Sequence, residues 1–309
     1  MKFLIPSLFL LLGTACNNLT IEFEDEHKPV FYVYAESGKP AYAYITESAK
    51  TEQAFFQVPD STQLLVQMNN SLNDTDTLKH AMIDTSDRAS FSGLMGLGSY
   101  RATYYKSNTA LNTSENYSFS LKYNDYPKIE LTAYIPESVP IDTFVITPNI
   151  AYSHGDFFMQ HNLNIRFTPP EAIGHFCVNV YIDYTDTTGY NNNEGRSIRD
   201  GFCMEKVFKD DEVLKSDEYY SLNYTILSER HSGDFIPTIY LIHISDDFYN
   251  YVMQETAFIE YRENSEFFGH MPSHIPYSMV PNAYANVFAY SVTKKTGELI
   301  QLSEPTIND

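Results

Sequence analysis

The chain has 309 residues, with 40 acidic and 20 basic side chains and a formal net charge of −20 at pH 7. A surface of this charge repels nucleic acid, so polynucleotide binding is not expected. Hydrophobic residues make up 43% of the chain, which excludes wholesale disorder, and the length is sufficient for two domains of ordinary size.

The first 15 residues have the three parts of a secretory signal peptide. Lys2 supplies a positive charge, residues 3–12 form an apolar core, and small residues stand directly before Cys16. The apolar core is shorter than the roughly 20 residues of a transmembrane helix. We therefore expect cleavage before Cys16 and lipidation of that cysteine, which would anchor the protein to a membrane. The alternative is an ordinary secretory signal in which Cys16 is incidental.

The segment that follows, residues 16–28, is polar and acidic, which is typical of a solvated tether. From Pro29 the pattern changes to short runs in which β-branched and aromatic residues alternate with polar ones, separated by turn residues. This pattern predicts an N-terminal β-sandwich domain over residues 29–140. Its strands are expected at residues 30–34, 41–45, 63–68, 98–105, 117–123 and 128–135.

Prolines at 136, 140 and 148 predict a domain boundary near residue 140 and a second β-sandwich over residues 141–309. Strands are expected at residues 163–167, 176–183, 219–227, 238–244 and 285–293. One helix is predicted near residues 245–263, capped by Ser245, with Asp246 and Asp247 favouring its first turn and apolar residues at helical spacing. The expected class is mainly all-β, with two immunoglobulin-like sandwiches and this helix packed on the second.

Cys177 and Cys203 form an even pair once Cys16 is assigned to lipid. Disulfides persist in exported proteins, and Cys177 lies in a strand-like run while Cys203 follows a polar loop, so a hairpin could bring them together. A disulfide between them is one expectation, and two buried thiols are the other.

Four segments resemble a known family. They are residues 131–136 (LTAYIP), 139–142 (VPID), 242–251 (IHISDDFYNY) and 282–291 (NAYANVFAYS). With the lipoprotein start, they make the chain similar to the domain-of-unknown-function family 4249 of bacterial outer-membrane lipoproteins. The resemblance implies a surface or periplasmic-face lipoprotein, often encoded beside TonB-dependent transporters. It implies no catalytic residues.

Candidate chemical sites are weak. His270 and His274 are separated by Pro272, so they cannot share a regular helical face, and a polar loop is expected there instead of a metal site. The oxygen-rich segments 183–194 and 74–77 lack helix-loop-helix calcium spacing, and we expect solvated loops. The sequence contains no nucleophile-elbow or phosphate-loop motif. We expect neither a metal nor a cofactor.

The chain contains 25 tyrosines and 21 phenylalanines. Most of these rings are expected in the two sandwich cores, and those near polar segments are the better candidates for a protein interface: Tyr184, Tyr190, Tyr249 and Tyr251. The functional expectation is a non-enzymatic, surface-exposed lipoprotein of the outer membrane that assists a TonB-dependent transporter in capturing or presenting its substrate. A surface adhesin is the alternative, and a hydrolase built from dispersed carboxylates is a third.

Overall fold

The computed structural model describes residues 28–47, 64–72, 74–81, 104–123, 125–153, 156–168, 170, 174–185, 202–228, 234–265 and 278–300. The expected mainly β class, with a single α-helix among these residues, is confirmed. In chain order the elements are β1 (Pro29–Glu36), β2 (Pro40–Glu47), β3 (Leu64–Asn69), β4 (Thr75–Thr77), β5 (Lys79–Ala81), β6 (Tyr104–Ala110), β7 (Asn116–Tyr123), β8 (Ile129–Tyr134), β9 (Ile141–Ser153), β10 (Asp156–Phe167), β11 (His175–Thr185), β12 (Phe202–Val207), the 3-10 helix η3 (Asp210–Glu212), β13 (Val213–Lys215), β14 (Tyr220–Ser228), β15 (Asp234–Ile244), α2 (Asp246–Ser265) and β16 (Tyr284–Thr296).

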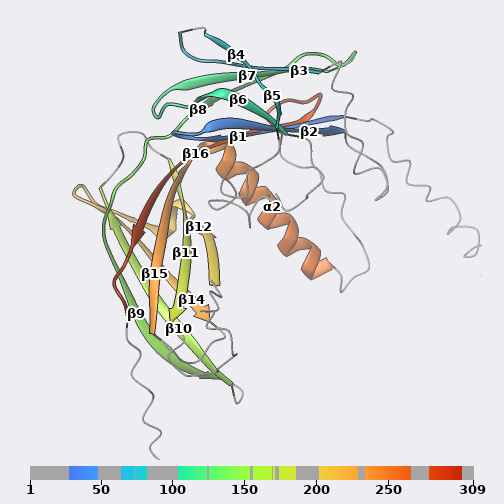
Figure 1. Ribbon diagram of the computed structural model, residues 1–309. Coiled ribbons are helices and arrows are strands. Elements are labelled where there is room, and N and C mark those ends of the chain that lie inside the picture. The colour runs from blue at the N-terminus through green and yellow to red at the C-terminus, as the bar shows by residue number, and fades with distance from the viewer. Residues whose placement is uncertain are drawn as a thin grey trace, which may run out of the picture.

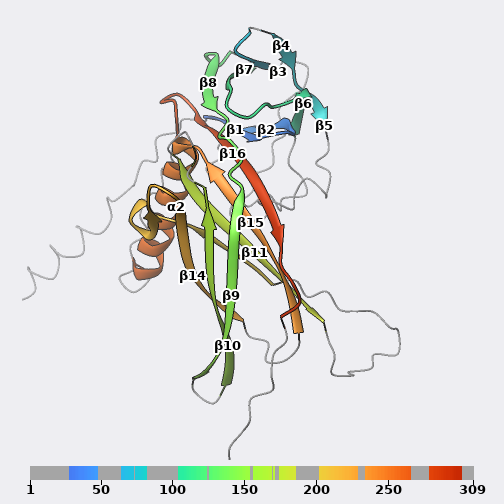
Figure 2. The same ribbon diagram turned by 90° about the vertical axis from the view of Figure 1, so that its left-hand side faces the viewer.

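The strands form one sheet of eight and two sheets of four. The large sheet has the order β12-β11-β15-β16-β1-β2-β6-β5, and the small sheets have the orders β4-β3-β7-β8 and β13-β14-β10-β9. Figures 1 and 2 show one small sheet lying over β1, β2 and β6, and the other lying over β11 and β15. Each small sheet therefore closes a sandwich with a different end of the large sheet.

Strand β16 joins the two ends of the large sheet. Its residues 284–290 pair in parallel with β1, and its residues 290–296 pair antiparallel with β15. Tyr290 is the residue at which one partner strand replaces the other, since it faces both Glu36 and Ile244 in register. One long strand thus belongs to both sandwiches.

Two buried cores follow from this arrangement. The first core lies between β1, β2, β6 and the sheet of β3, β7 and β8, and β16 contributes Ala285, Val287 and Ala289 to it. The second core lies between β11, β15 and the sheet of β10 and β14. The chain crosses from one sandwich to the other through residues 135–140, and β16 later returns to the first. A division near residue 140 therefore leaves one strand of the first core in the later part of the chain.

Helix α2 covers the outer face of the large sheet. Ser245 caps it as expected, because its Oγ accepts a hydrogen bond of 3.4 Å from the Phe248 amide. Phe248 and Val252 pack in a third buried cluster with residues of β11, β15 and β16. Tyr251 reaches farther, with its ring centroid 6.0 Å from that of Tyr32 in β1. The helix therefore contacts strands of both sandwiches. Among the described residues no helix is both long and apolar enough to cross a membrane.

The largest difference from the expected strands is β9, because Pro140 and Pro148 led to the prediction of a boundary where a 13-residue strand begins. Pro148 lies inside β9 opposite His161 of β10. Strand β9 is at the edge of its sheet, where a proline is tolerated because the position that lacks an N–H can face away from the neighbouring strand. The sequence also did not predict strand β12 or the three short strands β4, β5 and β13.

His161 is an unusual residue of the second sandwich. Its side chain is fully buried, its ring lies 4.9 Å from that of Phe235, and neither ring nitrogen has a hydrogen-bond partner among the described residues. Burial lowers the pKa of His161 below its usual 6.5, because the charged form would lose its hydration. The folded protein therefore holds a neutral imidazole in an apolar setting.

Replacing this ring tests its effect on stability. We expect His161→Leu to raise the free energy of unfolding by about 1–2 kcal/mol near pH 7, because it removes two unsatisfied polar atoms. The advantage should grow as the pH falls below about 6.5, since the unfolded wild-type chain gains a proton that the folded chain does not, with a limiting slope of about 1.4 kcal/mol per pH unit. Urea unfolding at several pH values measures both effects. The exposed His80→Leu serves as control, and a pH-independent difference for His161→Leu would contradict the account.

Candidate functional site

The connection between the sandwiches is fixed at one carbonyl group. The Glu137 carbonyl oxygen accepts a hydrogen bond of 2.6 Å from the Ser291 hydroxyl and lies 2.9 Å from Nδ1 of His243. Ser291 belongs to β16 and His243 to β15, and both side chains are buried. The linker, residues 135–140, is therefore held against β15 and β16, which are paired with each other in the large sheet.

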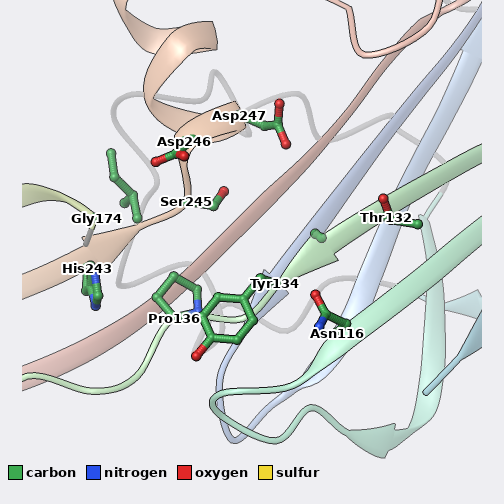
Figure 3. Close-up of a pocket in the computed structure, with 11 residues that line it drawn as sticks. Asn116, Thr132, Tyr134, Pro136, Gly174, His243, Ser245, Asp246 and Asp247 are labelled. Atoms are coloured by element: carbon green, nitrogen blue, oxygen red, sulfur yellow. The ribbon is translucent and has the colours of Figure 1, made fainter. Parts of the chain in front are cut away.

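A pocket of about 200 Å³ opens beside this linker. We call it the junction pocket, and Figure 3 shows its lining. One wall comes from β7, β8 and the linker, and the other from residue 174, the end of β15 and the first turn of α2. The lining residues are Asn116, Thr132, Ala133, Tyr134, Pro136, Gly174, His243, Ile244, Ser245, Asp246 and Asp247.

The polar groups of the junction pocket reach it for different structural reasons. Asn116 and Tyr134 are register partners on the exposed face of the first small sheet. Asp246 and Asp247 occupy the first helical turn, where carboxylates interact favourably with the helix dipole. His243 is only 2% exposed, and burial lowers its pKa below 6.5 despite the opposing effect of the Glu137 carbonyl. The pocket thus combines acceptors with one phenol ring and a neutral imidazole.

His175 lies beside the pocket and connects three elements. Its Nδ1 is 3.1 Å from Asp210 of η3, and its Nε2 is 3.3 Å from Asp246 of α2. The ring stacks on Tyr249, with centroids 3.7 Å apart and planes inclined by 6°. Partial burial, followed by the charges of Asp210 and its neighbours, raises the pKa of the Tyr249 phenol. This cluster holds the start of the helix against β11.

A second cavity, of about 450 Å³, lies beside the oxygen-rich segment 74–77. The Asp76 carboxylate accepts four hydrogen bonds there, from the amide and side chain of both Asn108 and Thr109, at 2.7–3.0 Å. Partial burial raises the pKa of Asp76, but these hydrogen bonds outweigh it, and the pKa lies below 3.8. Asp76 therefore ties β4 to β6, and within the described residues no group of three or more acidic, histidine or cysteine side chains could hold a metal.

We expect Asp76→Asn to lower the free energy of unfolding by about 1–2 kcal/mol at neutral pH, because an amide cannot accept all four hydrogen bonds. The loss should shrink below about pH 4, where the unfolded wild-type carboxylate takes up a proton and its stabilising contribution disappears. Thermal unfolding across this pH range measures the effect. Asp74→Asn is the matched control, since Asp74 accepts one exposed side-chain hydrogen bond from Asn70. Equal losses in both variants would contradict the assignment.

The four tyrosines expected at an interface lie in different parts of the chain and have different surroundings. Tyr249 stacks on His175, and Tyr251 packs with its centroid 4.9 Å from that of Phe288, so both rings help to dock α2. Tyr184 lies in β11 opposite Phe235. Tyr190 lies outside the described residues, as do Cys16, His270, His274 and most of the loop after β11. The structure therefore does not bring the four tyrosines together.

The expected bridge between Cys177 and Cys203 does not fit the strand register. Strands β11 and β12 do pair, but Cys177 faces Val207 while Cys203 faces Tyr181. The two cysteines are thus offset by four residues, or roughly 13 Å along the strand. Bridged cysteines have Cα atoms less than about 7 Å apart. The expectation of a disulfide is therefore wrong for this register, and Cys177 is a buried thiol.

This difference is directly measurable. When the protein is denatured without reductant, we expect an alkylating reagent to modify both Cys177 and Cys203, because neither should be bonded to the other. Peptide mapping by mass spectrometry then recovers the two cysteines on separate peptides. A single linked peptide that separates only after reduction would show that the register is wrong.

Sequence reasoning missed most of the junction pocket. Asp246 and Asp247 were recognised as favourable first-turn residues and, with His243, as part of a segment that resembles a family, but not as lining a site, and Gly174 and Asn116 belonged to no motif. These positions lie far apart in the chain and meet only because β15, α2 and β8 converge at the linker. No local signal in the sequence would have joined them.

Comparison with protein-family models finds no matching family, and comparison with curated proteins finds no matching relative. The resemblance to the outer-membrane lipoproteins therefore stays a prediction.

Proposed function

We propose that this protein is a non-enzymatic, lipid-anchored subunit of the outer membrane, exposed at the cell surface, that assists a TonB-dependent transporter in capturing or presenting its substrate. Acyl chains on Cys16 would hold it at the membrane, and no nucleic acid is involved. The signal-like residues 1–15 and the family resemblance of four segments support this proposal.

One structural observation favours it. The acidic tether leads directly into β1, which pairs with β2 on one side and with the shared strand β16 on the other. The tether between Cys16 and β1 spans at most roughly 45 Å when fully extended. A membrane anchor would therefore lie within roughly 45 Å of β1, an inner strand of the large sheet.

Anchoring in the same membrane explains how a small interface could be sufficient to hold this protein on a transporter. Two proteins held in one membrane meet at a high effective concentration, so the contact between them can be weak in solution and still be occupied. The net charge of −20 further suits an exposed domain that stays away from anionic lipid.

Two measurements test the proposal in the native membrane. A palmitate analogue should label the wild-type protein and Thr20→Ser, but not Cys16→Ser, because only Cys16 offers the acylated thiol. Capture in gentle detergent should recover a stoichiometric TonB-dependent transporter with the wild type and far less with Cys16→Ser. Labelling of Cys16→Ser would overturn the anchor, and recovery of the wild type without a transporter would overturn the accessory role.

A further inference from the structure

The second cavity, of about 450 Å³, lies at one end of the first sandwich. One side comes from the β3–β4 hairpin of the small sheet, and the other comes from the end of β6 in the large sheet and the turn that leads to β7. Asp76 of β4 ties the two sides together through its hydrogen bonds with Asn108 and Thr109 of β6. Pockets that hold small ligands usually have volumes of roughly 300–1,000 Å³. The cavity is therefore large enough for a whole small molecule.

The lining of the second cavity limits the charge of a ligand. No lysine, arginine or histidine is among the lining residues, so an anion would find no cationic side chain, and the net charge of −20 would repel it. Asp74 and Asp76 are the two charged lining residues. Four hydrogen bonds occupy the acceptor sites of Asp76, so the exposed Asp74 is the carboxylate left for a ligand. One exposed carboxylate attracts a cation only weakly, and a neutral ligand is the better match.

Two asparagine side chains offer unused hydrogen-bonding groups at the cavity. Nδ2 of Asn108 donates to Asp76 at 2.7 Å, and Nδ2 of Asn112 donates to Glu115 at 3.3 Å. Because a carboxylate only accepts, these contacts fix which end of each amide is the nitrogen. Among the described residues neither Oδ1 accepts a hydrogen bond, and each nitrogen keeps a second N–H. Each amide can thus both accept from and donate to a ligand, as a hydroxyl group requires.

The base of the cavity is apolar. Met68 and Tyr117 line it and are only 3% and 4% exposed, whereas Asp74, Asn108 and Asn112 are exposed residues at its rim. The Tyr117 hydroxyl accepts a hydrogen bond of 2.8 Å from the Asn112 amide, so this phenol is already occupied. A ligand with a hydrocarbon face and a polar edge would cover such a base and reach the rim. A sugar ring has this form, with C–H groups on one face and hydroxyls around its edge.

The turn that carries Asn112 is held in one conformation. Ser114 has a φ of 60°, which is uncommon for a residue other than glycine. Its amide donates to the Ile135 carbonyl at 2.9 Å, and the Ile135 amide donates back to the Glu115 carbonyl at 2.9 Å. The rim group is therefore placed before a ligand arrives, which lowers the entropy that binding costs.

We infer that the second cavity binds a neutral saccharide ring, whose hydroxyls bond to Asp74, Asn108 and Asn112. The C–H face of the ring lies over Met68 and Tyr117. This inference rests on the cavity alone and is independent of the proposed membrane role.

The first test compares neutral and charged sugars. Saturation-transfer NMR of the full chain is recorded with the methyl glycosides of glucose, galactose, mannose and N-acetylglucosamine, and the best ligand is titrated by calorimetry. We expect saturable binding of at least one glycoside, at least about tenfold weaker binding of its uronate, and no gain for its 2-amino counterpart. Failure of all four glycosides to bind, equal binding of the uronate, or tighter binding of the amino sugar would overturn the inference.

Variants then locate the site. Asn112→Ala and Asp74→Asn should each weaken binding of the best glycoside about three- to tenfold, because each removes a hydrogen-bonding group from the rim. Asn223→Ala, on the exposed face of β14, and Asp125→Asn, between β7 and β8, are the matched controls and should leave the affinity unchanged. Thermal unfolding verifies that each variant is folded. Unchanged affinity in folded Asn112→Ala and Asp74→Asn would place the sugar elsewhere and contradict the assignment.

Discussion

The pairing of β16 with both β1 and β15 is the constraint on which the rest of the structure depends. A parallel ladder from Val30 to Glu36 attaches the beginning of the described chain to its last strand, and the same strand continues into the second sandwich. The first core is incomplete without β16, which contributes small residues to it, and the continuation of β16 pairs with β15, a strand of the second core. The linker, the helix and the junction pocket all take their positions from this strand.

The sequence was a good guide wherever a feature is local. Alternating aromatic and polar residues located most long strands, and Ser245 with the acidic pair after it located the helix within two residues of its ends. The sequence was a poor guide to features that depend on residues distant in the chain. Pro148 resembled a boundary signal because its tolerance depends on β9 being an edge strand, and the cysteine pair seemed able to form a bridge because register cannot be read from spacing.

The candidate site shows the same limit more strongly. The position of the His243 ring depends on the Glu137 carbonyl of the linker, on the absence of a side chain at Gly174 and on the burial of β15, none of which is visible in a local pattern. The pocket lies where the two sandwiches meet, so its shape depends on their relative placement. Its lining comes from β8, the linker and the start of α2 together.

The most direct test of the shared strand is to produce residues 28–140 alone and to record their NMR spectrum and thermal unfolding. Our account expects a chain without a dispersed spectrum or a cooperative transition, because the fragment lacks the Ala285, Val287 and Ala289 side chains of its core and leaves one edge of β1 unpaired. Addition of residues 278–300 through a flexible linker should restore both signals. A fragment that folds cooperatively by itself, with no gain from the added strand, would contradict the account.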